Sequence, residues 1–287
     1  MPAALFPPGF LGIMEKEGLT FSQRKEETRR KPNDSVGDIA MKTKKRKTFP
    51  VILLLLLPVA AAVYFFQFTP YGYLLTVPYR PAFKEIADHV YINKNSVLDQ
   101  REILSLIEQA EERDRAFFGG LCYLDQTVFI ICDDEGLTRK LGEDHGTVIY
   151  SVPFKQHFIC ISDEYLELDI LAHEITHAEL HTRLSVKACQ RIPTWFDEGL
   201  ATQNDYRERY SEEQWVLQTD NGKNTVALED MDTPSEFYAG EAEDRRFRYL
   251  NAKHEICLWM EAHGRQGLLE LLEKLNDGAD FYSVYKR

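Results

Sequence analysis

The distribution of apolar residues divides the chain into a long uncharged stretch and a larger segment in which apolar and polar positions alternate. Val51–Phe66 is almost wholly apolar, and no charged residue occurs in Phe49–Tyr79. A run of about 20 apolar residues is long enough for one membrane-spanning helix, which we place at residues 49–68. Residues 82–287 show the shorter patterns of a folded domain, joined to that helix by a linker over residues 69–81.

Within residues 82–287 the patterns predict a small sheet followed by a mainly helical part. Ser96, with Asp99 three residues later, predicts the start of a helix that runs to about Phe117. Runs of β-branched and aromatic residues predict the strands Gln126–Cys132, Thr147–Val152 and Phe154–Ser162. Helical patterns cover Asp163–Arg183, Ser211–Gln218, Pro234–Ala239 and Glu243–Ala262, the last stopping near Gly264. This order predicts an α+β fold with a small mixed sheet, in which Phe158–Ile161 is a candidate edge strand.

The helix predicted over Asp163–Arg183 carries apolar residues on both of its faces. They are Leu168, Leu171, Ile175 and Ala178 along one stripe and Leu166 and Ile170 on the other side. Such a helix is expected to be buried on both sides. His173, Glu174 and His177 would then lie in a covered interior, where polar side chains need partners.

These three residues form the motif His173-Glu174-Ile175-Thr176-His177. At 3.6 residues per turn the two histidines lie about 40° apart on one face, so both imidazoles can reach one metal ion. Glu174 projects about 100° from His173, where it can touch a metal-bound water without being a ligand. Two histidines and a glutamate at this spacing are typical of zinc-assisted hydrolysis.

A second motif follows at Pro193-Thr194-Trp195-Phe196-Asp197-Glu198-Gly199-Leu200-Ala201. Pro193 and Thr194 predict the start of a new helix, with Thr194 and Asp197 capping its first turn. Glu198 then lies in the first or second turn. Zinc hydrolases that use two histidines and one glutamate leave the fourth position to water, so Glu198 is the predicted third ligand.

Together the two motifs resemble the gluzincin metallopeptidases, specifically the bacterial peptidase MA-like group with its P-x-W-x-x-E-G-L-A signature. The likeness is sharp over about residues 165–205 and loose to about residue 285. It implies a zincin-like fold and a Zn²⁺ ion held by His173, His177 and Glu198, with Glu174 as the general base. It also implies that Asp197 supports a ligand histidine, the alternative to its capping role. Tyr249 resembles a tyrosine of the family's C-terminal helical part that can steady an oxyanion.

His181 follows His177 by four residues but is not a predicted ligand. Metzincins place their third histidine six residues after the second, with a glycine between, and this chain has no such pattern. We therefore expect His181 to be exposed or to support the ligands from behind. The five cysteines include no C-x-x-C pair, so no second metal site is indicated. Cys122 and Cys132 can form a disulfide, although small buried hydrophobic residues are the default interpretation.

Charge is distributed unevenly. Residues 1–50 contain eleven Lys and Arg against six Asp and Glu, whereas residues 51–287 contain 23 against 40. A domain this acidic repels phosphates and offers no basic patch, which argues against nucleic-acid binding.

The basic residues also orient the predicted span. Residues 1–48 form a basic cytoplasmic or disordered segment, in which Met41 is a possible alternative start. The positive-inside rule then leaves the C-terminal domain outside the cytoplasm, on a single-pass membrane protein. Alternatively, residues 41–62 are a signal peptide that is cleaved near Ala62, and the domain is secreted.

Two functions follow from these observations. The first is a membrane-anchored zinc metallopeptidase that hydrolyses protein or peptide substrates through a zinc-activated water, with Glu174 as the general base. The second is a catalytically inactive, zinc-containing domain that binds peptides. Glu174 favours the enzyme, because a structural zinc site is usually closed by four protein ligands and needs no carboxylate beside an open position. Hydrolysis of a non-protein amide by the same chemistry is a third option.

Overall fold

The computed structural model describes residues 48–123, 127–142, 147–151 and 156–285. The predicted N-terminal segment up to residue 47 lies outside these residues, as do Gln126, Val152 and Phe154 at the ends of predicted strands. The chain divides into two units between Tyr64 and Phe65, within the helix α1 (Thr48–Phe68). The unit that begins at Phe65 contains the sheet and all the elements below.

The helix α1 covers the position of the predicted membrane span. Among the described residues, however, we find no helix that combines the length and the apolar character needed to cross a membrane. The structure thus confirms the helix and does not confirm the span.

A five-stranded mixed sheet lies at the centre of the folded unit, with the order β1-β2-β3-β5-β4. The strands are β1 (Phe83–Ala87), β2 (Val90–Asn93), β3 (Thr127–Cys132), β4 (Thr147–Ser151) and β5 (His157–Ser162). β2, β3 and β5 are parallel, and β1 and β4 pair antiparallel with β2 and β5. The α+β class and the three predicted strands are confirmed. The edge assignment is wrong, because β4 pairs with β5 and leaves Phe158–Ile161 inside the sheet.

Helices account for most of the remaining described residues. They are α2 (Pro70–Leu75), α3 (Gln100–Phe118), α4 (Glu135–Leu141), α5 (Leu168–Arg183), α6 (Val186–Cys189), α7 (Thr194–Ala201), α8 (Glu212–Gln218), α9 (Pro234–Phe237), α10 (Ala242–Asn276) and α11 (Phe281–Val284). Gly264 interrupts α10 with φ 65° and ψ −176°, at the predicted stop. Asp99 rather than Ser96 caps α3, since the Asp99 side chain accepts the Arg101 N–H. Ser96 instead contacts Asp133.

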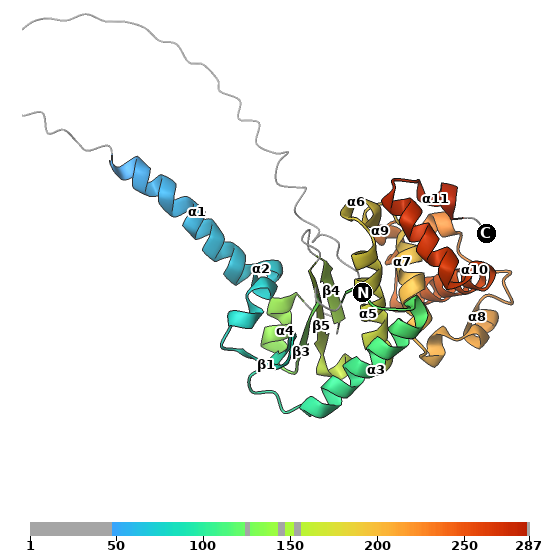
Figure 1. Ribbon diagram of the computed structural model, residues 1–287, viewed down its shortest axis with the longest axis horizontal. Helices are drawn as coiled ribbons and strands as arrows, with labels where there is room; N and C mark the ends of the chain where they lie inside the picture. Colours follow the sequence, from blue (N-terminus) through green and yellow to red (C-terminus); the bar gives the residue numbers. More distant parts are fainter. Residues whose placement is uncertain (1–47, 124–126, 143–146, 152–155, 286–287) are drawn as a thin grey trace, which may run out of the picture. The chain divides into compact units, whose positions relative to one another are not determined.

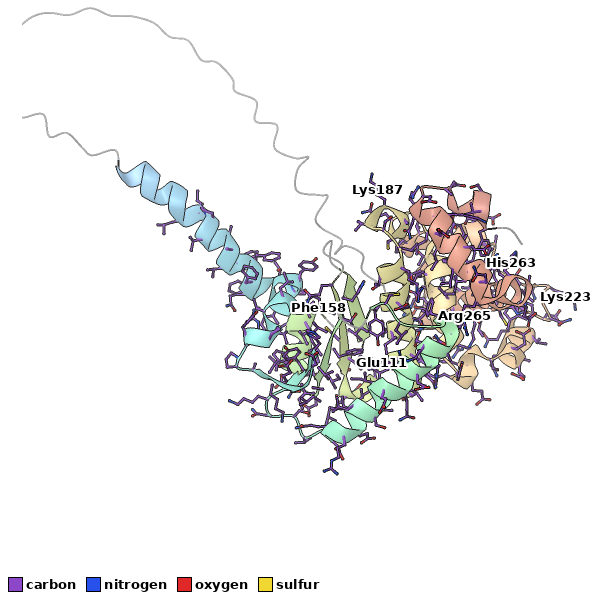
Figure 2. The ribbon with its side chains drawn as sticks, in the orientation of Figure 1. Glu111, Phe158, Lys187, Lys223, His263 and Arg265 are labelled. Carbon is purple, nitrogen blue, oxygen red and sulfur yellow. The ribbon has the colours of Figure 1, made fainter. Side chains whose placement is uncertain are left out.

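Helices cover both faces of the sheet (Figure 1). α3 and α5 pack on one face, where Ile107 and Ile175 meet Ile131 and Ile159. α2 and α4 cover the other face. Figure 2 labels Phe158 on this second face, within the sheet, whereas Lys187 and Lys223 are exposed on the helical part. The stripe predicted on α5 is therefore confirmed as the contact between helix and sheet.

The predicted linker over residues 69–81 is wrong, because it belongs to the folded unit. It forms α2 and a 3₁₀ turn at Val77–Tyr79. Tyr73, Leu74 and Val77 are buried against the sheet, with Phe83 and Phe158 among their neighbours. The cysteines are thiols, and Cys122 and Cys132 form no disulfide in the described segments that contain them.

The C-terminal half forms a second hydrophobic core made mainly of helices. It joins the end of α5 to α6, α7, α10 and α11, through residues such as Leu180, Trp195, Phe196, Ile256 and Leu272. α5 contributes to both cores, since its earlier residues pack on the sheet. This double packing buries every residue from Ile170 to Thr182, as the sequence pattern predicted.

Candidate metal centre

Two helices bring the predicted ligands together. α5 carries His173 and His177, and α7 carries Asp197 and Glu198 in its first two turns. Pro193 occupies the N-cap position of α7 without a side-chain cap, and the Thr194 N–H donates to the Asp232 carbonyl at 2.8 Å. The predicted helix start is thus confirmed to within one residue, but the capping role of Thr194 is wrong, because Thr194 is the first helical residue. The capping role of Asp197 is wrong, because its carboxylate turns inward to the histidines.

Three ligand atoms form a nearly equilateral triangle. His173 Nε2 and His177 Nε2 are 3.2 Å apart, and each lies 3.5 Å from Glu198 Oε2. Glu198 Oε2 is buried and has no hydrogen-bond partner among the described residues. A buried carboxylate oxygen left in this state is costly unless a cation satisfies it.

The size of this triangle fits a zinc ion. Bond lengths of about 2.0–2.2 Å in tetrahedral coordination separate neighbouring ligand atoms by about 3.3–3.5 Å. Two imidazole nitrogens and a carboxylate oxygen are also ligand types that zinc accepts. The His173, His177 and Glu198 side chains therefore match the donor set and the spacing of a three-ligand zinc site.

Asp197 binds two histidines at once. Its Oδ1 accepts from His177 Nδ1 at 2.7 Å, and its Oδ2 accepts from His181 Nε2 at 2.9 Å. Burial works against the charged carboxylate, but the adjacent His181 and His177 rings hold the pKa of Asp197 well below its usual range. Burial also lowers the pKa of His177, and the Asp197 and Glu198 carboxylates overcome it to raise that pKa well above its ordinary value. Asp197 thus fixes the His177 ring with Nε2 directed to the triangle.

Two tyrosines surround the remaining part of Glu198. The Tyr238 hydroxyl donates to Glu198 Oε1, the oxygen that lies outside the triangle. Tyr249 is buried, with its ring centroid 6.2 Å from that of His173. Burial and the neighbouring Glu198 carboxylate hold the pKa of Tyr249 well above its usual range, so it is a neutral phenol. The structure therefore brings Tyr249 to the predicted site and adds Tyr238.

Glu174 is 7% exposed. Among the described residues its carboxylate forms no hydrogen bond or ion pair. By helix geometry it projects about 100° from His173. Glu174 is thus a buried acid, adjacent in sequence to the ligand His173, and its carboxylate is not engaged by a hydrogen bond or ion pair within the described part of the chain.

Gly199 lets α7 approach α10 closely. A Cβ at this position would lie 2.7 Å from the Ala252 carbonyl oxygen and 3.0 Å from the Ile256 side chain. Real Cβ atoms do not tolerate the shorter distance, so any other residue would push the two helices apart. The close contact sets the distance of Glu198 from α10, which carries Tyr249.

A buried polar network supports the motif from the side of α3. Thr176 Oγ1 donates to Asp114 Oδ1 at 2.5 Å, and Asn204 Nδ2 donates to the same oxygen at 2.9 Å. Burial raises the pKa of Asp114 well above its ordinary value, although these two hydrogen bonds oppose the shift. The network connects α3, α5 and the 3₁₀ turn at Thr202–Asn204, so it fixes the rotation of the motif helix.

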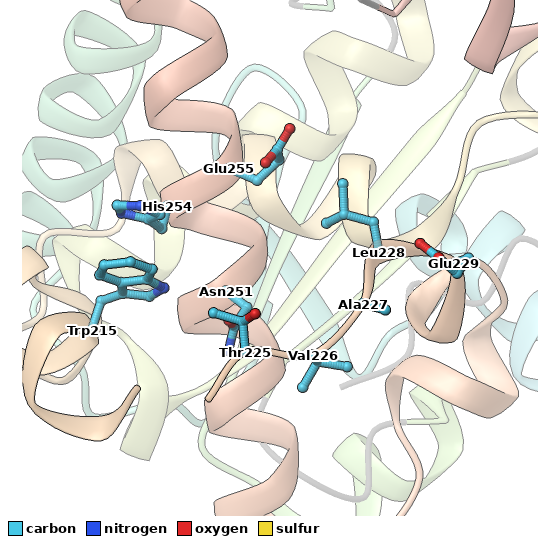
Figure 3. A pocket seen from close by; sticks show the side chains of 9 residues that line it. All are labelled: Trp215, Thr225, Val226, Ala227, Leu228, Glu229, Asn251, His254 and Glu255. Atoms are coloured by element: carbon cyan, nitrogen blue, oxygen red, sulfur yellow. The ribbon is translucent and has the colours of Figure 1, made fainter. Parts of the chain in front are cut away.

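A separate pocket of about 400 Å³ lies in the helical part (Figure 3). Trp215 and His254 stack on its wall with ring centroids 3.4 Å apart, and Thr225 and Asn251 also line it. It shares no residue with the ligand triangle.

The sequence identified the triangle and Asp197 but missed part of their support. His181 is buried and hydrogen bonded to Asp197, so its exposed alternative is wrong, and this contact is the one that a supporting residue would make. The i, i+4, i+8 spacing of His173, His177 and His181 was the available signal. No local sequence pattern indicated the contact of Tyr238 with Glu198, which lies forty residues away along the chain.

No protein-family model and no curated protein matches this chain. The resemblance to the gluzincins therefore stays a prediction that rests on the two motifs.

Proposed function

We propose that this protein is a zinc metallopeptidase of the gluzincin type, in which His173, His177 and Glu198 hold the metal. The observation that carries the proposal is the triangle of ligand atoms with 3.2–3.5 Å edges, one corner of which is a buried carboxylate oxygen without a hydrogen-bond partner. Its size and donor set correspond to zinc with one position left for water or substrate.

The chemistry follows from the residues around the triangle. Zinc bound there supplies a positive charge that polarises both water and the carbonyl of the scissile bond. Glu174 takes the proton from the attacking water and passes it to the leaving amide nitrogen, so that the C–N bond breaks without expelling an amide anion. Tyr249, a neutral phenol beside Glu198, is the residue proposed to donate to the oxyanion that forms at the carbonyl oxygen.

The alternative is an inactive zinc-containing domain that binds peptides. A structural site is usually closed by a fourth protein ligand. Among the described residues, the group around Glu198 contains three candidate ligands, and the Glu174 carboxylate forms no hydrogen bond or ion pair. Both observations favour the enzyme. Membrane attachment, and a position outside the cytoplasm, are proposed from the sequence pattern of residues 41–80 alone.

The decisive experiment compares Glu174→Gln with the wild-type full-length chain on a broad peptide library. The amide keeps the size of the side chain but cannot accept the proton, so we expect bound zinc to stay at one equivalent and turnover to fall at least about a hundredfold. Glu164→Gln, the same change at an exposed residue, is the matched control. Hydrolysis by Glu174→Gln at the wild-type rate, with zinc in place, would falsify the mechanism. Wild-type protein that binds zinc and peptides but cleaves none would support the inactive domain.

A further inference from the structure

Asp197 and His181 lie on the side of His177 that faces away from the ligand triangle. The Asp197 carboxylate is held between two imidazoles, at 2.7 Å from His177 Nδ1 and 2.9 Å from His181 Nε2. All three side chains are deeply buried, with exposed fractions of 2% for His177, 3% for His181 and 6% for Asp197. Water therefore has little access to either oxygen of the carboxylate.

These distances are those of hydrogen bonds. Ligands of one tetrahedral zinc ion would lie about 3.3–3.5 Å apart, whereas both contacts of Asp197 are shorter than 3 Å. A carboxylate only accepts hydrogen bonds, so the two imidazole nitrogens that face it carry the hydrogens. His177 then has Nδ1 protonated and Nε2 available to a metal.

We propose that His181 is a positioning residue for the metal site, which acts through Asp197 on the ligand His177. This inference rests on the proposed zinc site and goes beyond it by naming the group that orients the ligand. By donating to Oδ2, His181 holds the carboxylate in the rotation that directs Oδ1 at His177 Nδ1. Without that donor, Oδ2 would be buried without a partner, and the carboxylate would turn or take up a proton.

The first residue of β5 is a neighbour of His181. His157, the first residue of β5, has its ring centroid 6.3 Å from that of His181, and its Nε2 is 2.9 Å from Thr182 Oγ1. On the other side, the ring centroid of His177 lies 6.0 Å from that of His181. His181 therefore has a residue of β5 and the ligand His177 as ring neighbours.

Two polar substitutions of His181 that differ only in side-chain length test this role. The amide nitrogen of Gln occupies roughly the place of His Nε2, so His181→Gln can still donate to Asp197. The amide of Asn corresponds to Nδ1 and falls short. Zinc affinity is measured on the full-length chain by competition with a chelator, and ligand geometry by the visible spectrum of the Co²⁺-loaded protein. His254→Gln is the control, since His254 contacts Glu212 and Trp215 away from the triangle.

We expect His181→Asn to weaken zinc binding by about tenfold or more and to alter the Co²⁺ spectrum, as is usual when the partner of a ligand histidine is lost. His181→Gln should stay within a few-fold of wild type. Wild-type affinity and spectrum in His181→Asn would overturn the inference while leaving the zinc site intact. An equal loss of zinc affinity in both variants would also overturn the inference, because the donor to Asp197 would then not matter. Two zinc equivalents in the wild type, falling to one in both variants, would make His181 a ligand. Absence of any zinc in the wild type would instead refute the proposed function.

Discussion

His177 lies between two groups of similar composition and different geometry. On its Nε2 side, His173 Nε2 lies at 3.2 Å and Glu198 Oε2 at 3.5 Å, and this Glu198 oxygen has no hydrogen-bond partner among the described residues. On its Nδ1 side, Asp197 and His181 are hydrogen bonded at 2.7–2.9 Å. Both groups contain histidines and a carboxylate within reach of a metal. Spacing and unsatisfied atoms, rather than residue types, distinguish the group that fits an ion from the group that supports it.

Removal of His177 should have the largest effect, because this residue belongs to both groups. His177→Ala takes away one ligand of three and the connection to Asp197, so we expect the zinc content to fall from one equivalent to near zero. Metal analysis of the purified full-length chain measures this. His254→Ala should keep its zinc. A full equivalent in His177→Ala would show that the metal is bound elsewhere.

Acidification should weaken zinc binding steeply. The Asp197 and Glu198 carboxylates outweigh the effect of burial and raise the pKa of His177. In the metal-free protein, its imidazole therefore keeps its proton up to a pH well above the usual range for histidine. Zinc must displace that proton, and each displaced proton makes the dissociation constant rise about tenfold per pH unit below this pKa. Titrations at pH 8, 7 and 6 should show the increase, with a proton released on binding. An affinity independent of pH would contradict the assignment of His177 Nε2 as a ligand.

Zinc should also stabilise the fold, since it neutralises the buried Glu198 oxygen. A ligand at a hundred times its dissociation constant stabilises the native state by about 2.7 kcal/mol. Thermal unfolding with and without a chelator should therefore differ by several degrees in the wild type. The same comparison in His177→Ala should show little difference, and an equal shift in both proteins would indicate a non-specific effect of the chelator.

The smallest predicted effect concerns Tyr238. Its hydroxyl donates a hydrogen bond to Glu198 Oε1, so that Oε2 is the oxygen that faces the ligand triangle. Tyr238→Phe removes one hydrogen bond to a charged group, worth about 1.5–3 kcal/mol at most, and water can replace part of it. We expect a few-fold loss of zinc affinity with the stoichiometry unchanged. Tyr206→Phe, at an exposed tyrosine, should bind zinc as the wild type does.

Local patterns in the sequence predicted the parts of the site that lie close together along the chain. His173, Glu174 and His177 share one helix, so spacing placed them together. Glu198 follows at the start of the next helix, and the usual donor set of zinc hydrolases indicated it as the third ligand. Tyr238 could not be predicted, because its contact with Glu198 depends on how α9 packs. The role of Asp197 stayed open for the same reason, since its direction depends on where α5 lies.

The same limit explains the errors in the fold. Strand order depends on contacts between distant segments. Nothing within Phe158–Ile161 therefore indicates that β4 pairs with this strand. Tyr73, Leu74 and Val77 continue an apolar run that begins near residue 51, and their burial against the sheet could not be separated from that run. The hairpin β1–β2 was missed because its strands are only five and four residues long.

Gly199 has a consequence for how the protein tolerates change. The distance between α7 and α10 is limited by backbone contact at this residue, with the Ala252 carbonyl as the opposing surface. Glu198, its immediate neighbour, is therefore located by main-chain atoms, which are the same whatever the side chains nearby. Conservative substitutions in the surrounding core, at Leu200 or Leu250 for example, are expected to change the free energy of unfolding while the ligand stays in place. The addition of a single carbon atom at residue 199, in contrast, places that atom against the Ala252 backbone, which cannot move without displacing the ligand.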